Sequence, residues 1–89
     1  MDITVYGPLR SATGEKTVTL EFTGTTVSDA LAEFTAAYPR ATPYLYDGDE
    51  VRSSVRVTIN GERAPLEAPV SNDAELTLMP AVQGGSIDG

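Results

Sequence analysis

One helix is clearly predicted in this 89-residue chain, over the segment Thr26-Val27-Ser28-Asp29-Ala30-Leu31-Ala32-Glu33-Phe34-Thr35-Ala36-Ala37-Tyr38. Its apolar residues recur at helical spacing and form a single stripe: Val27, Ala30, Leu31, Phe34 and Tyr38. Thr26 and Asp29 resemble a capping box with a shorter acid, and both Asp29 and Glu33 favour the positive end of the helix dipole. Pro39 is expected to end the helix near Tyr38. We interpret the stripe as a face that packs on a sheet and not as a cofactor site.

Two strands are predicted before this helix. Residues 3–5 alternate apolar and polar side chains with β-branched residues, and Gly7-Pro8 then breaks the pattern. Residues 16–22 repeat the alternation, with Val18, Leu20 and Phe22 on one face. The connection contains Gly14 and is longer than a two-residue turn, so we expect a loose hairpin.

Two strands joined by a tight turn are predicted after the helix. Residues 55–59 alternate and lead into Asn60-Gly61, which is the strongest short hairpin signal in the chain. A short return strand is expected near residues 63–66, and Pro65 and Pro69 limit it to a sheet edge.

The last strand is predicted at residues 75–79, with Leu76 and Leu78 inward, while residues 40–54 are expected to be irregular. The order of elements is then strand, strand, helix, strand, short strand, strand. This layout matches an α+β domain of the β-grasp (ubiquitin-like) type, in which a mixed sheet of four to five strands carries one main helix across one face. The final strand of that fold runs centrally, parallel and adjacent to the first. We expect the domain at residues 1–80 and a flexible tail at residues 81–89.

The composition argues against several classes of function. There is no cysteine and no histidine, so the chain lacks disulfides, thiolate chemistry, the commonest general base and the commonest transition-metal ligand. Six basic and thirteen acidic side chains give a net charge of −7, which repels phosphate backbones and anionic lipid head groups. We therefore expect no metal, no bound cofactor, no nucleic-acid or membrane partner, and no self-sufficient hydrolase.

Nothing in the sequence predicts export. No apolar run approaches the ~20 residues needed to span a bilayer, and the first residues lack a basic region followed by an apolar one. We expect a cytoplasmic monomer. The acidic excess, with Lys16 as the only lysine, suggests a salt-rich cytoplasm or a GC-rich genome.

The acidic group Asp47-Gly48-Asp49-Glu50 raises the question of a calcium site. The twelve-residue loop pattern of alternating ligands that ends in glutamate is absent. We interpret this group as a solvated turn.

The segment Leu78-Met79-Pro80-Ala81-Val82-Gln83-Gly84-Gly85 is the candidate functional part of the chain. Pro80 cannot extend a central strand, so the sheet is expected to stop at about Met79. From Pro80 to Gly85 an extended chain would reach roughly 20 Å, at ~3.3 to 3.6 Å per residue. Two glycines without Cβ atoms allow the backbone to enter a narrow slot on another protein. The alternative is an ordinary frayed terminus.

The chain resembles the ubiquitin-like sulfur carriers and small archaeal modifier proteins, relatives of the small subunit of molybdopterin synthase (MoaD) and of the thiamin sulfur carrier (ThiS). The resemblance covers nearly the whole length. It rests on Ile3-Thr4-Val5-Tyr6, Thr26-Val27-Ser28-Asp29-Ala30-Leu31 and Ile59-Asn60-Gly61, and above all on the apolar-Pro-x-Val-x-Gly-Gly ending at Gly85.

This resemblance implies a carrier whose terminal glycine carboxylate is activated by an E1-like enzyme that uses ATP. A sulfur donor then gives a thiocarboxylate, or a lysine amine gives an isopeptide bond. Gly85 would be the reactive residue and Gly84 would give access to the active site. The implied partners are the E1-like enzyme, the molybdopterin synthase large subunit or another sulfur acceptor, and lysines of target proteins. The chain itself would not be an enzyme.

Ser86-Ile87-Asp88-Gly89 departs from the family pattern, because activated members end at the two glycines. Gly85 within the chain is an ordinary peptide carbonyl and cannot be adenylated. We therefore predict a precursor that a peptidase cuts after Gly85. The alternatives are that these four residues are an artificial addition or that the chain is a homologue that has lost the carrier function. Activation at Gly89 is less favourable, because Ile87 and Asp88 would fit a glycine-shaped channel badly.

Strand parity predicts where a partner would dock. The residues expected on the sheet face away from the helix are Thr4, Tyr6, Thr19, Arg56, Thr58, Thr77 and Met79. Tyr6, Arg56, Thr58 and Met79, with Pro80 and Val82 of the ending, are the candidate partner-binding residues. Lys16 is the candidate acceptor of a modification.

A second class of function is a non-covalent ubiquitin-like interaction module with an inert tail. Deleting residues 84–89 would spare the function of such a module and abolish that of a carrier. An iron–sulfur use of the fold would need cysteines, which the chain lacks.

Overall fold

The computed structural model describes residues 1–80, and its main helix is the predicted one, α2 (Val27–Ala37). Its N-terminus carries the predicted capping box: the Asp29 N–H donates to Thr26 Oγ1 (3.2 Å), and the Thr26 N–H donates to Asp29 Oδ2 (3.1 Å). At the other end the Tyr38 N–H donates to the Phe34 carbonyl, and Pro39 follows. Local sequence therefore sets both ends of α2.

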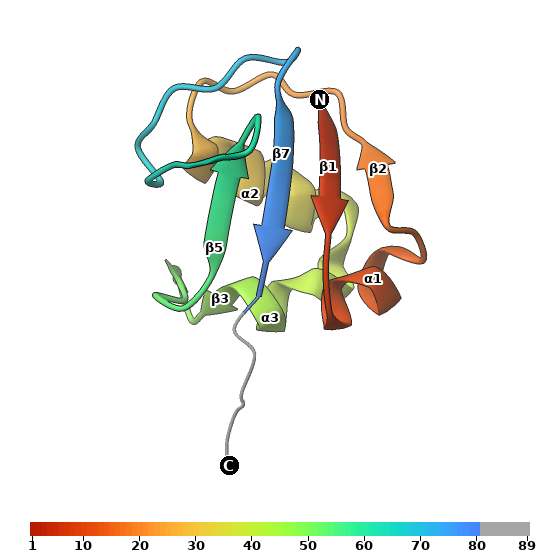
Figure 1. Cartoon of the computed structure of the whole chain (residues 1–89). Coiled ribbons are helices and arrows are strands. Elements are labelled where there is room, and N and C mark those ends of the chain that lie inside the picture. The colour runs from red at the N-terminus through yellow and green to blue at the C-terminus, as the bar shows by residue number, and fades with distance from the viewer. Residues whose placement is uncertain (81–89) are drawn as a thin grey trace.

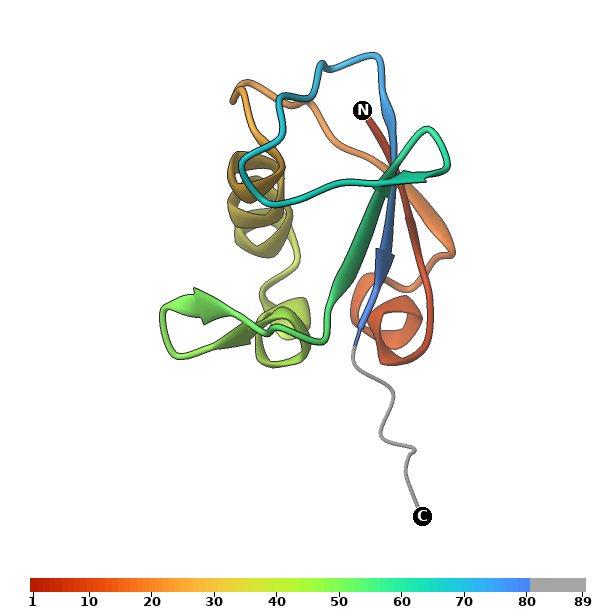
Figure 2. The same cartoon turned by 60° about the vertical axis from the view of Figure 1, so that its left-hand side comes forward.

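A mixed five-stranded sheet lies against α2 (Figures 1 and 2). Its order is β2-β1-β7-β5-β6, with β1 at Asp2–Val5, β2 at Thr17–Thr19, β5 at Arg56–Ile59, β6 at Glu62–Arg63 and β7 at Glu75–Met79. β7 is central, pairing in parallel with β1 and antiparallel with β5. This is the predicted β-grasp arrangement, with the last strand beside the first.

The core lies between the sheet and α2. Its fully buried large side chains come from the helix stripe, from alternate positions of β1 and β7, and from two short helices: Val27, Leu31, Phe34, Ile3, Val5, Leu76, Leu78, Leu9 and Leu45. The alternation that predicted the strands is therefore the alternation that fills the core.

The Asn60-Gly61 hairpin is confirmed. Asn60 has φ 52° and Gly61 has φ 89°, and two positive φ values are what a tight two-residue hairpin turn requires. Asn60 also joins this hairpin to β7, because its side-chain oxygen accepts from the Glu75 N–H (2.9 Å) and its own N–H donates to the Glu75 carbonyl (2.8 Å). The return strand ends at Arg63, earlier than predicted, since Pro65 cannot donate to a ladder.

The first two strands pair antiparallel, as predicted for a loose hairpin, but their connection contains a helix that was not predicted, α1 (Pro8–Thr13). Gly7 precedes it with φ 62°, Pro8 occupies its first turn, and Gly14 ends it in the left-handed conformation. Only Leu9 in this helix is buried, so no apolar repeat marks it in the sequence.

The second strand is shorter than predicted and stops at Thr19. β2 ends there because its pairing partner, β1, begins at Asp2. Beyond that point the Leu20 N–H still donates a hydrogen bond to the Met1 carbonyl (2.8 Å). Phe22 is buried as expected, but its N–H donates to Asn72 Oδ1 (2.9 Å) and not to a neighbouring strand.

Residues 40–54 are more regular than predicted. They include a 3-10 helix η1 (Pro39–Ala41), a helix α3 (Thr42–Leu45) and a small hairpin of β3 (Tyr46–Asp47) with β4 (Glu50–Val51). Ala41 and Leu45 are fully buried and hold this segment against the core. The acidic turn Asp47-Gly48-Asp49-Glu50 forms the hairpin tip, where Gly48 has φ 67°.

Candidate functional site

The candidate site lies where the two parallel central strands end. β1 and β7 run in the same direction, so Tyr6 and Met79 lie at the same end of the two strands. The Tyr6 N–H donates to the Leu78 carbonyl (3.3 Å), which extends the ladder one step past the named strands. β7 therefore ends in the middle of a five-stranded sheet, between β1 and β5, and is not an edge strand.

Pro80, one of the predicted partner-binding residues, is buried. Its Cγ lies 3.5 Å from the position that a Cβ on Gly7 would occupy. Gly7 has φ 62°, a conformation that favours glycine, whereas the Pro80 ring lies at an ordinary van der Waals distance from that position. Pro80 is thus a packing residue that holds the end of β7 beside the turn that follows β1.

The outer face of the sheet is the face away from α2. On this face, the row of side chains closest to the end of the two strands consists of Tyr6, Met79 and Arg56. Arg56 is the register partner of Met79, and Tyr6 follows Val5, the partner of Leu78. Tyr6 is 44% exposed, Arg56 is exposed and Met79 is half-buried. The structure therefore brings three of the predicted partner-binding residues together.

A row of threonines lies next to it. Thr77 pairs with Thr4 on one side and with Thr58 on the other, and Thr4 pairs with Thr17. Thr4 Oγ1 and Thr17 Oγ1 are 3.2 Å apart. Thr58, a predicted contact residue, is half-buried in this row.

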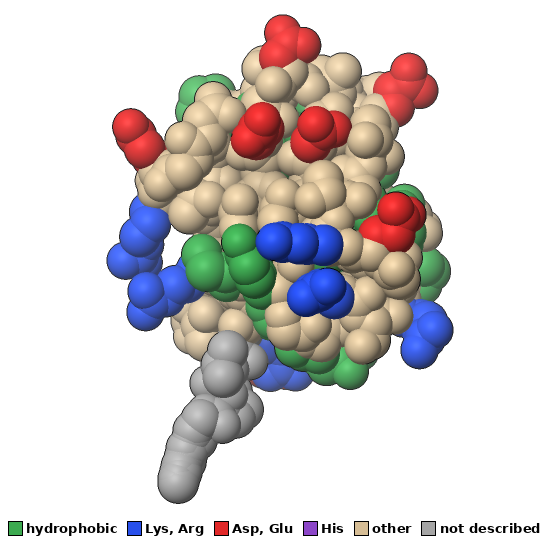
Figure 3. Space-filling model, turned by 45° about the vertical axis from the view of Figure 1, so that its right-hand side comes forward, with side chains coloured by type: hydrophobic (Ala, Val, Ile, Leu, Met, Phe, Trp, Pro, Cys, Tyr) green, Lys and Arg blue, Asp and Glu red, His purple; other side chains and the backbone are tan. Residues whose placement is uncertain are grey.

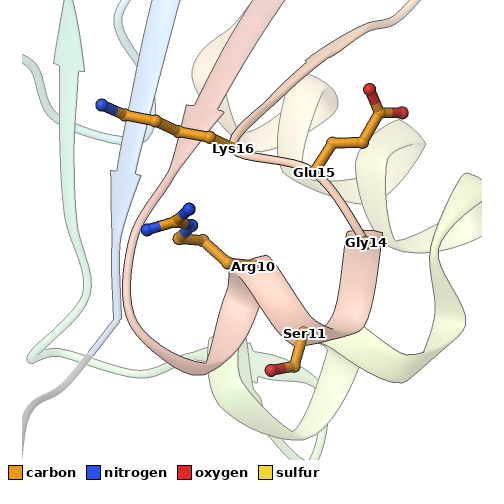
Figure 4. A pocket seen from close by; sticks show the side chains of 5 residues that line it. All are labelled: Arg10, Ser11, Gly14, Glu15 and Lys16. Atoms are coloured by element: carbon orange, nitrogen blue, oxygen red, sulfur yellow. The ribbon is translucent and has the colours of Figure 1, made fainter.

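Two cationic side chains, both from the connection between β1 and β2, lie near the same end of the sheet (Figure 4). Lys16 Nζ lies 5.9 Å from the centre of the Tyr6 ring, within the range of a cation–π contact. Arg10 of α1 lies below Lys16, and both line a depression of about 330 Å³ with Ser11, Gly14 and Glu15. The Glu15 carboxylate points away from both cationic groups (Figure 4).

Sequence reasoning missed Arg10, because it depends on α1 to reach this place. Pro8 and Gly14, at the two ends of α1, are the signals that could have revealed the helix. Thr19 lies on the outer face as predicted, but at the far end of the sheet, where it pairs with Asp2.

The predicted reactive and accessory residues of the ending, Val82, Gly84 and Gly85, lie outside the described residues. Within residues 1–80 no group of three or more Asp, Glu, His or Cys residues could hold a metal ion. No helix in this described part is long and apolar enough to cross a membrane.

Three solved structures are similar over most of the chain. SAMP1 from Haloferax volcanii is 32% identical, with a TM-score of 0.83, and the match covers 96% of this chain and 98% of that one. SAMP1 from Methanosarcina acetivorans is 27% identical, with a TM-score of 0.80 and 94% coverage of both chains. A chain of the Amycolatopsis orientalis BexX/CysO complex is 29% identical, with a TM-score of 0.75, and the match covers 94% of this chain and 98% of that one.

Two of these structures are of small archaeal modifier proteins, and the third is a complex of BexX with CysO. The profile described as "ThiS family" matches residues 3–85, which is nearly the whole chain and ends at the second glycine. The chain therefore belongs to the ThiS family.

Proposed function

We propose that this protein is a carboxyl carrier whose Gly85, freed by removal of residues 86–89, is adenylated by an E1-like partner enzyme. A Gly85 carboxylate oxygen would attack the α-phosphorus of ATP bound by that enzyme, and pyrophosphate would leave. The mixed anhydride with AMP makes a poor electrophile reactive. The chain would hold no cofactor of its own, since ATP belongs to the partner.

The acyl-adenylate has two uses that need the same terminus. A sulfur nucleophile at the oxidation level of sulfide would replace AMP and leave a thiocarboxylate, which a sulfur acceptor such as a molybdopterin synthase large subunit would use. A lysine amine would instead replace AMP, lose a proton and form an isopeptide bond. Both uses leave the chemistry to partners, and this chain supplies the reacting group and its presentation.

The observation that carries this proposal is the position of β7. The strand that leads to the two glycines is central and parallel to β1, and Pro80 is packed beside Gly7 at its end. A carrier gains from such a support, because a fixed starting point lowers the entropy lost when the terminus enters an active site. The end of the family match at residue 85 supports the choice of Gly85.

The outer face of the sheet is the surface that we assign to the activating enzyme. Tyr6 and Met79 give it an apolar centre next to the end of β7, and the threonine row continues it. A partner that covers this face would hold the terminus within reach of its active site. Val82 would add a further contact in the channel.

Lys16 is the amine that we assign as an acceptor of modification. It is the only lysine and is exposed. The Met1 ammonium is less accessible, because it donates to Leu20 O (2.8 Å) and Asn72 Oδ1 (3.0 Å) while the Met1 side chain is buried.

Pyrophosphate release with the cognate activating enzyme and ATP tests the proposal. Three forms should be compared: residues 1–85, residues 1–83 and residues 1–89. We expect release with the first form only, and the mass gain of sulfur in place of oxygen when a sulfur donor is present. No release with residues 1–85 would reject the proposal, and full biological function of residues 1–83 would indicate a non-covalent module.

A further inference from the structure

Charges are segregated along the outer face of the sheet. At the far end, Asp2 of β1 and Glu75 of β7 are direct register partners, which puts two like charges side by side. The Thr19 hydroxyl donates to Asp2 Oδ1 (3.1 Å), but no cation is paired with either acid in the register. This end of the face is therefore anionic.

The opposite end, next to Pro80, is cationic. Arg56 lies on one side of the Tyr6–Met79 pair, and Lys16 and Arg10 lie on the other (Figure 4). The threonine row separates the two ends, and Arg63 borders it on β6. Figure 3 shows the same division, with Lys and Arg side chains gathered toward the end where the described chain stops and most Asp and Glu side chains further away.

Hydrogen bonds within the described fold do not engage these cations, although Lys16 contacts the Tyr6 ring. Among residues 1–80, Arg10, Lys16 and Arg56 donate no side-chain hydrogen bond, whereas Arg52 donates from Nε to the Pro43 carbonyl (3.0 Å). Asp2 and Glu75, at the anionic end, are four residues away along the strands from Tyr6 and Met79, which is about 13 Å at ~3.3 Å per residue. That exceeds the screening length of ~8 to 10 Å at physiological salt, so the acids neutralise the cations little.

We propose that this cationic end docks on an acidic surface of the activating enzyme, with partner carboxylates around the entrance that receives the terminus. This rests on the proposed carrier function and adds the chemistry of the partner's surface. Arginine suits carboxylates because its planar group can donate two parallel hydrogen bonds. Tyr6 and Met79 would fill the apolar centre of the same interface.

The anionic end of the face would fix the orientation in which the partner docks. A partner turned end for end would place its carboxylates against Asp2 and Glu75, and like charges that face each other across an interface oppose binding. Because the chain has a net charge of −7, attraction to an acidic partner is local to this end. A polyphosphate chain would meet the overall negative field, so we favour a folded acidic protein.

Charge reversal on the form ending at residue 83 tests this, because that form cannot be activated and binding is then measured apart from chemistry. We expect Arg56→Glu and Lys16→Glu each to weaken binding to the cognate activating enzyme by about tenfold, mainly through slower association. Raising the salt concentration should weaken binding of the unchanged protein and reduce the difference between it and the variants.

Arg40→Glu is the matched control, because it makes the same charge change at an exposed residue of η1, which is not part of the sheet. Unchanged thermal unfolding of all three variants shows that the fold is retained. Equal losses for Arg40→Glu and Arg56→Glu, or affinity that does not depend on salt, would overturn the proposal. Self-association of the protein that Arg56→Glu abolishes would assign the cationic end to a second copy and overturn it as well.

Pyrophosphate release by the form ending at residue 85 separates this failure from that of the carrier function. If Arg56→Glu does not weaken binding while residues 1–85 still support release, the docking chemistry is wrong and the carrier function stands. If binding behaves as expected and release does not occur, the docking surface stands without adenylation.

Discussion

The inner and outer faces of β1 and β7 differ in what their side chains do. On the inner face Ile3, Val5, Leu76 and Leu78 have no exposed surface and contact the helix-side core. On the outer face of the same strands every side chain is exposed or half-buried: Asp2, Thr4, Tyr6, Glu75, Thr77 and Met79. Two adjacent residues on one strand can therefore serve separate purposes, one for stability and one for recognition.

This separation has a physical origin in the strand geometry, since successive side chains point to opposite sides of a sheet. With only one main helix, the sheet is covered on one side and open on the other. A substitution on one face should then change stability with little effect on docking, and the reverse should hold on the other face.

The largest effect is expected for Leu78→Ala. It leaves a cavity among fully buried neighbours, and we expect a loss of about 2–5 kcal/mol in the free energy of unfolding. Chemical denaturation followed by circular dichroism measures it. Met79→Ala is the matched control one residue away, with an expected loss below ~1 kcal/mol. Similar losses for the two variants would contradict the division between the faces.

The next effect concerns recognition. Tyr6→Ala combined with Met79→Ala removes the apolar centre of the outer face, and we expect about 30-fold weaker binding to the activating enzyme, equivalent to ~2 kcal/mol. Calorimetric titration of the form ending at residue 83 measures it. Tyr44, which is 41% exposed in α3, provides a control, because Tyr44→Ala removes an exposed aromatic ring from an element that is not part of the sheet. Unchanged binding of the double variant would reject the outer face as the docking surface.

A smaller loss of stability is expected for Asn72→Ala. The Asn72 side-chain oxygen accepts from the Phe22 N–H (2.9 Å) and from the Met1 ammonium (3.0 Å), and so closes the far end of the sheet. Removing it leaves both donors without this partner, at a cost of about 1–3 kcal/mol. Asn72→Asp keeps an acceptor oxygen and should retain most of the stability. Equal stability of the two variants in thermal unfolding would show that these bonds contribute nothing.

The fold could largely be predicted because its main signals are local. Thr26 and Asp29 fix the start of α2, and Asn60-Gly61 fixes a hairpin turn, each within a few residues. α1 was missed because it is a six-residue helix with one buried side chain, and it packs against η1, which is distant in the sequence. The early end of β2 also depends on a distant residue, Met1, which a pattern along the chain does not reveal.

The site was predictable where it depends on strand parity and not where it depends on packing between segments. Parity correctly placed Tyr6, Arg56 and Met79 on one face. The burial of Pro80 depends on Gly7, and the position of Arg10 depends on α1, so both needed the structure. The assignment of Gly84 and Gly85 stays a prediction from the family pattern, because these residues lie outside the described part.

The smallest expected effect is a pH dependence that comes from the covered side of the molecule. The Thr25 N–H (3.0 Å), the Thr26 N–H (3.1 Å) and the Thr25 hydroxyl (3.2 Å) all donate to Asp29 Oδ2. These bonds, led by that from the Thr25 backbone, lower the pKa of Asp29 below its usual value. A carboxylate with a lower pKa in the folded state binds fewer protons there than in the unfolded state. Its contribution to stability is therefore complete above the unfolded pKa of ~3.9 and is lost as the pH falls through the folded pKa.

Asp29→Asn tests this contribution. The variant should have a lower melting temperature than the unchanged protein near neutral pH, and the difference should shrink as the pH is lowered below ~4. Asp73→Asn, in the exposed turn before β7, makes the same change of charge away from the α2 cap and should give a smaller difference at neutral pH. A constant gap between Asp29→Asn and the unchanged protein from pH 7 to pH 3 would mean that the carboxylate charge does not stabilise the start of α2. Because the cap lies on the helix side of the sheet, we expect neither variant to alter docking on the outer face.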